Sequence, residues 1–144
     1  MISELTDLEL WERLESVNLS NEAFKHREHV RAAFVALSKS ADLAEGALRF
    51  RRALKRFAHA HGAEQKYNET MTWAYLVLIH ERMHREEFED SRQFLTAYPE
   101  LLNHRGILGR YYDVETLTRS PLARRLFLLP GSEHLASAAQ GSSR

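Results

Sequence analysis

The chain contains no cysteine, only six glycines and only three prolines. The absence of cysteine excludes disulfides, thiolate zinc sites and cysteine nucleophiles, so any bound metal would take nitrogen and oxygen ligands. Few glycines and prolines are typical of a compact helical protein. The sequence also lacks a signal-peptide pattern and an apolar run of the roughly 20 residues needed to span a bilayer. We therefore expect a cytoplasmic protein with no membrane partner.

The chain also has no net charge, because 20 basic residues balance 20 acidic ones. The whole molecule thus exerts no long-range attraction on nucleic acid. Basic residues do cluster over 49–56, but the aromatic residues within and directly after that segment, Phe50 and Phe57, fall on a predicted core stripe. A nucleic-acid partner is disfavoured for this reason. Phosphate-binding loops and the serine nucleophile elbow are absent as well.

What the sequence does contain is helical periodicity. Apolar residues recur every three or four positions in four segments, and no segment alternates as a strand does. Thr6 and Glu9 form a predicted capping box at the first of them. Gly62 gives the third a C-terminal stop. The predicted main helices span about 7–17, 26–38, 42–61 and 69–86.

The remainder is predicted to be shorter helices. Phe94 and Leu95 start a short helical pattern that Pro99 ends, and Ser120 followed by Pro121 is typical of another helix start. The residues after Pro130 are small and polar, so they predict a flexible tail. The fold class is therefore all-α, with a single-domain bundle of four main helices plus a short-helix carboxy-terminal section over 1–129 and a tail over 130–144.

Two histidines begin the second predicted helix. His26 and His29 are three residues apart, so their rings share one helix face. Together with Glu69, they would form the two-histidine, one-carboxylate set used for divalent metals such as iron or zinc. The same pair would also suit metal-free acid/base chemistry or hydrogen-bonded packing. These three residues are the candidate catalytic and metal-binding residues.

A second group surrounds the start of the fourth predicted helix. Lys66 and Tyr67 offer an ammonium and a phenol beside Glu69, and His61 ends the stripe of the preceding helix nearby. We expect Lys66, Tyr67 and His61 to contact a ligand. The alternative is that this segment is simply a helix start, with a polar residue as cap. His104 is expected in a turn outside the site.

Together, these two groups of residues resemble the sequence motifs of a protein family. The pattern Phe-x-His-x-x-His-x-Arg-x-Ala over 24–33, with Lys-Tyr-Asn-Glu-Thr over 66–70 and two tyrosines at 111–112, resembles a family of small bacterial all-helical proteins over most of 20–128. That family's pattern has histidine where this chain has Asn68. The resemblance supports the choice of His26, His29 and Glu69 and implies no particular reaction.

The sequence thus favours a small enzyme acting on a small polar organic molecule through a His/His/Glu pocket, with or without a divalent metal. The alternative is a non-catalytic ligand-binding or protein-interaction module whose histidines are structural. A homodimer is compatible with either function.

Overall fold

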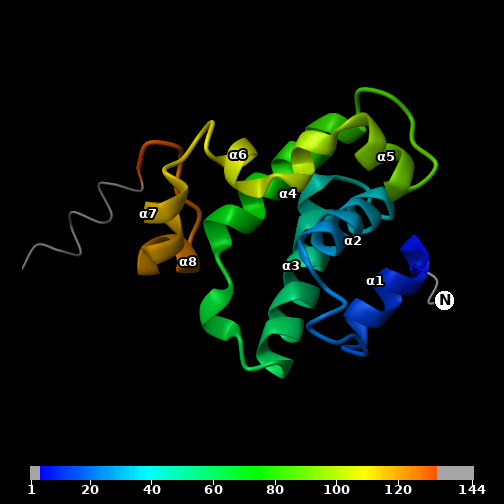
Figure 1. Cartoon of the computed structure of the whole chain (residues 1–144), viewed down its shortest axis with the longest axis horizontal. Coiled ribbons are helices and arrows are strands. Elements are labelled where there is room, and N and C mark those ends of the chain that lie inside the picture. Colours follow the sequence, from blue (N-terminus) through cyan, green and yellow to red (C-terminus); the bar gives the residue numbers. More distant parts are fainter. Residues whose placement is uncertain (1–3, 133–144) are drawn as a thin grey trace, which may run out of the picture.

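The computed structural model describes residues 4–132, and over that range the chain is helical with no strand, which confirms the all-α class (Figure 1). The four longest helices, α1–α4, lie in the four segments predicted to be helical. The structure contains α1 (Asp7–Glu15), α2 (His26–Ser38), α3 (Leu43–Ala60), η1 (Glu64–Lys66), α4 (Glu69–Met83), α5 (Ser91–Ala97), η2 (Pro99–Leu102), α6 (His104–Leu108), α7 (Val114–Arg119) and α8 (Pro121–Arg125).

Local interactions set most helix ends. The predicted capping box of α1 is present, because Thr6 accepts from the Glu9 amide and Glu9 accepts from the Thr6 amide. Helix α1 ends two residues earlier than predicted, and Val17 just beyond it adopts a left-handed conformation with φ of 56°. Helix α4 likewise ends at Met83 instead of near residue 86.

Helix α2 is the centre of the packing. Every residue from Val30 to Leu37 is buried, so α2 is covered all round. Helices α1, α3, α4, α5 and the short η2 all contact it. The first turn of α2 also lies near residues distant in sequence, because the His26 ring contacts Tyr75 on α4 and His104 on α6.

The carboxy-terminal section docks on the start of α4 through Asn68 and Thr70. The Asn68 side chain caps α4 at the Met71 amide and also donates to the Leu117 carbonyl oxygen at 3.1 Å. The Thr70 hydroxyl donates to the carbonyl oxygen of Leu126 at 2.8 Å and accepts from the amide of Leu128 at 3.1 Å. In Figure 1, α7 and α8 accordingly lie beside α4, on the opposite side from α1.

Replacing Thr70 by valine tests this docking. Valine keeps the side chain's shape but leaves the Leu128 amide and the Leu126 carbonyl without their buried partner, so we expect a loss of about 1–3 kcal/mol in the free energy of unfolding. Urea denaturation measures the loss. Thr96→Val is the matched control, because its exposed hydroxyl bonds only within α5. Equal stabilities of the two variants would contradict the docking role.

None of the helices within residues 4–132 is both long and apolar enough to cross a membrane. The predicted tail over 130–144 lies outside the described residues from 133 onward.

Candidate functional site

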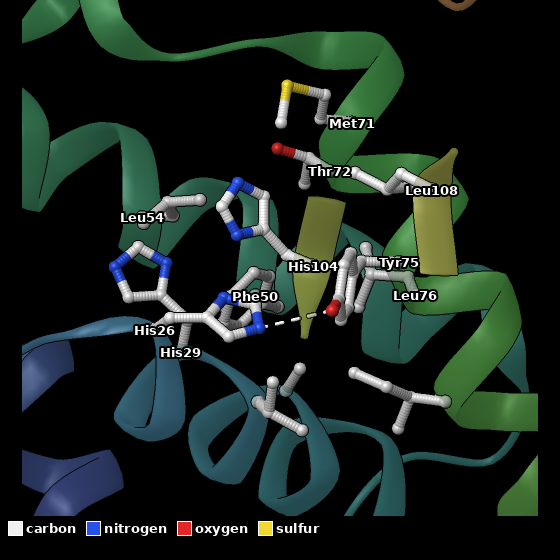
Figure 2. Close-up of a pocket in the computed structure, with 13 residues that line it drawn as sticks. His26, His29, Phe50, Leu54, Met71, Thr72, Tyr75, Leu76, His104 and Leu108 are labelled. Carbon is white, nitrogen blue, oxygen red and sulfur yellow. Dashed lines mark hydrogen bonds between the residues drawn. The ribbon is translucent and has the colours of Figure 1, made fainter. Parts of the chain in front are cut away.

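A small cavity opens beside the first turn of α2. We call it the histidine pocket, because the polar side chains that line it are His26, His29, His104, Thr72 and Tyr75. Its volume is about 130 Å³, and α2, α3, α4 and α6 all contribute to its wall. Figure 2 shows the three imidazole rings arranged around the same space. The rest of the lining is apolar, and includes Val30, Ala33, Phe50, Leu54, Leu76 and Ile79.

The ring of His26 is held by a backbone carbonyl. Its Nε2 atom lies 2.8 Å from the oxygen of Leu101 and 3.1 Å from the hydroxyl of Tyr75. Because a carbonyl oxygen only accepts, Nε2 carries a proton. The Tyr75 hydroxyl donates to the same oxygen at 2.7 Å, and burial raises the pKa of Tyr75, which keeps that phenol protonated. A neutral His26 therefore keeps its lone pair on Nδ1.

His29 is an uncharged imidazole at neutral pH. Burial, the largest cause, and the neighbouring His26 lower its pKa from 6.5 to about 4, while a hydrogen bond with the Phe24 backbone acts in the opposite direction. The ring also stacks on Phe24 with centroids 4.1 Å apart. A neutral imidazole has one ring nitrogen with a lone pair, so the uncharged His29 side chain can accept a proton.

This pKa makes folding stability depend on pH. Between pH 6.5 and 4 the unfolded chain binds a proton at His29 that the folded chain rejects, so stability falls as the pH falls through this window. The full shift corresponds to roughly 3–4 kcal/mol. Urea unfolding at several pH values measures the slope. His29→Gln should make the slope shallower, leaving the part that His104 contributes, and His59→Gln, at an exposed site, should not change it; an unchanged slope in His29→Gln would contradict the assignment.

His104 belongs to this pocket, although the sequence placed it outside the site. It is the first residue of α6, and its ring centroid lies 5.1 Å from that of His26. Burial, His26 and Arg105 all lower its pKa, in that order. The local signal, a histidine directly after a capping Asn103, was present, but nothing local shows that α6 packs against α4.

The Glu69 carboxylate lines a different hollow, and its oxygens already accept hydrogen bonds from other side chains. Both its oxygens accept from Arg51 Nε, at 2.8 and 3.0 Å. The Tyr67 hydroxyl donates to it at 2.6 Å and Trp73 Nε1 at 3.0 Å. Burial raises the pKa of Glu69, but these hydrogen bonds outweigh burial and the net effect is a lowered pKa. Its carboxylate thus joins α3 to the start of α4.

The other expected ligand-binding residues also have definite positions. His61 Nε2 bonds the Leu19 carbonyl oxygen at 3.1 Å, and its ring packs on Phe57, so His61 holds the loop before α2. Tyr67 lines two hollows, one of about 290 Å³ that also includes His29 and Lys66 and one of about 460 Å³ that includes Glu69. Lys66 is exposed at the rim of the first.

The expected convergence of His26, His29 and Glu69 is therefore not what the structure shows. His26 and His29 share one pocket, whereas Glu69 lines the other hollow and is held by Arg51. Within residues 4–132, no three histidine, aspartate or glutamate side chains are arranged to hold a metal ion. The reason is that Arg51 and Trp73 bind the Glu69 carboxylate at the other hollow, and the spacing of residues in the sequence does not reveal the contact with Arg51.

Comparisons with known proteins give no further information, because no family model, curated protein or solved structure matches the chain.

Proposed function

We propose that this protein is a small enzyme that binds a compact organic molecule in the histidine pocket and uses His29 as a general base. The observation that carries the proposal is the uncharged His29 imidazole, with its pKa lowered to about 4, at the wall of a cavity. Imidazole in its neutral form can accept a proton from a bound molecule.

The pocket also limits the ligand. Its volume of about 130 Å³ is close to that of a cavity of about 150 Å³ that accommodates benzene. The lining is mostly apolar, with polar groups gathered at His26, His29 and His104. The ligand class is therefore a compact, largely apolar molecule with one hydrogen-bonding or acidic group directed at the histidines, instead of the small polar molecule that the sequence favours.

The low pKa of His29 defines the type of proton that it can remove. The imidazole is fully in its basic form at neutral pH, but a base with a pKa of about 4 accepts protons only from an acidic or activated group. His26 would orient the bound molecule. Its bond to the Leu101 carbonyl fixes the imidazole ring and therefore the direction of the Nδ1 lone pair. The apolar wall excludes water and strengthens these interactions.

Benzisoxazole is a suitable probe of this function. It is compact and apolar, and its conversion needs one base: the base removes the ring C–H proton, the nitrogen–oxygen bond breaks, and cyanophenolate forms. We expect saturable formation of cyanophenolate above the buffer rate, with a rate that falls as the pH approaches 4. Chemical-shift changes at the methyl groups of Ala33, Leu54 and Met71 would show that the probe occupies this pocket.

The hydrogen bonds of His26 favour a second function, which is ligand binding without catalysis. Its Nε2 atom is already bonded to Leu101 and Tyr75, as a structural histidine would be. Saturable binding of benzisoxazole with no cyanophenolate formation would support this second function over the enzymatic one.

A further inference from the structure

The hollow that Glu69 lines lies between α3, η1 and α8, outside the histidine pocket. Its volume is about 460 Å³, larger than that of the histidine pocket. Three cationic side chains from two separate elements line it: Lys55 on α3, and Arg124 and Arg125 on α8. The apolar surfaces of Ala58 and Pro121 form part of its wall.

Lys55 and Arg124 are held in place, and none of the three cations is neutralised. Lys55 Nζ lies 5.3 Å from the centre of the Tyr67 ring, a favourable position over its face. Arg124 Nη2 donates to the Thr118 carbonyl oxygen at 3.0 Å, which restrains the guanidinium without cancelling its charge. Within residues 4–132 no carboxylate forms an ion pair with Lys55, Arg124 or Arg125.

The two glutamates that line the hollow are directed at other groups. Glu69 is saturated by Arg51, Tyr67 and Trp73. Glu64 lies 3.4 Å from His59 Nδ1, at an exposed position. The hollow is therefore net positive in a protein whose total charge is zero.

From these observations we propose that this hollow, which we call the phosphate hollow, binds the phosphate group of a small organic phosphate. Two arginines offer paired N–H donors that match phosphate oxygens, and Lys55 adds a point charge from the opposite wall. The apolar surfaces of Ala58 and Pro121, with the Tyr67 ring, would contact the organic part. This site is independent of the histidine pocket and of the reaction proposed for it.

Phenyl phosphate and inorganic phosphate serve as probes in isothermal titration calorimetry and backbone-amide NMR. We expect phenyl phosphate to bind more tightly than inorganic phosphate, with shifts at Ala58, Gln65 and Arg124, because only the ester contacts the apolar wall. Equal affinities would overturn the assignment of an ester. The absence of saturable shifts up to about 10 mM, above the millimolar range of a weak specific site, would overturn the site itself.

The charge requirement is tested by variants. Arg124→Gln with Arg125→Gln should raise the Kd for phenyl phosphate at least about tenfold, or 1.4 kcal/mol. Lys55→Gln, at an exposed position on α3, tests the opposite wall even if the double variant fails to fold. Arg110→Gln with Arg119→Gln, both exposed and outside the hollow, is the matched control. Equal effects in all variants would overturn the proposal, as would tighter binding of a single-stranded oligonucleotide than of phenyl phosphate.

Discussion

Replacing His29 by glutamine should lower the rate of benzisoxazole conversion by about 10²–10⁴-fold, the usual contribution of a positioned general base. Glutamine retains an amide that can donate to the Phe24 carbonyl, but it has no basic nitrogen. The loss should appear in kcat more than in KM, because the neutral imidazole contributes to the proton transfer and less to apolar binding. Initial rates of cyanophenolate formation at neutral pH measure the effect.

His59→Gln is the matched control for this substitution. The His59 side chain is 80% exposed near the end of α3 and lines neither the histidine pocket nor the phosphate hollow. Its variant should retain the wild-type rate. If His29→Gln converts the probe as fast as this control does, His29 is not the base and the enzymatic proposal fails, whereas the phosphate hollow is unaffected.

Replacing Arg31 by methionine should cost about 3 kcal/mol of folding free energy, at the low end of the range for breaking a buried ion pair. Arg31 is 5% exposed. Its Nη2 atom donates to Asp7 at 3.0 Å and to the Leu5 carbonyl oxygen at 2.7 Å, and Nε donates to the Ser91 hydroxyl at 3.0 Å. One guanidinium thus ties α1 and α5 to α2, and methionine would leave the Asp7 carboxylate without its buried cation.

Arg92→Met provides the comparison. Arg92 also pairs with a carboxylate, Glu4 at 3.0 Å, but its side chain is 74% exposed, so its removal should cost less than about 1 kcal/mol. Urea unfolding followed by far-UV circular dichroism measures both variants. A cost for Arg31→Met as small as that for Arg92→Met would mean that the network around Asp7 adds nothing to stability.

The helices were predictable because their signals are local. The capping box at Thr6 and the Ser120–Pro121 start both involve residues within three positions of one another, and both occur where predicted. Leu54 shows the limit of periodicity. It continues the α3 stripe that predicts burial, yet it is only partly buried, because the histidine pocket opens beside it. A cavity is a product of several helices, and the pattern of one helix does not reveal it.

The site was predictable only in part, for the same reason. His26 and His29 share a pocket as their spacing on one helix requires. His104 reaches that pocket because α6 packs against α4, and Glu69 stays outside it because Arg51, 18 positions earlier, binds its carboxylate. Both outcomes depend on contacts between helices far apart in sequence. The Asn68 cap, in contrast, matches the alternative that this segment is a helix start.

The bond between His26 and the Leu101 carbonyl has a consequence for mutagenesis and for evolution. The acceptor is part of the peptide backbone, so it survives any replacement of the side chain at position 101 that leaves η2 in place. An alanine scan would therefore measure the loss of packing by the Leu101 side chain. It would not detect the role of the carbonyl oxygen, which alanine retains. Related chains could keep the orientation of His26 with different apolar residues at this position, and the group that aligns the imidazole would leave no signature in a sequence alignment.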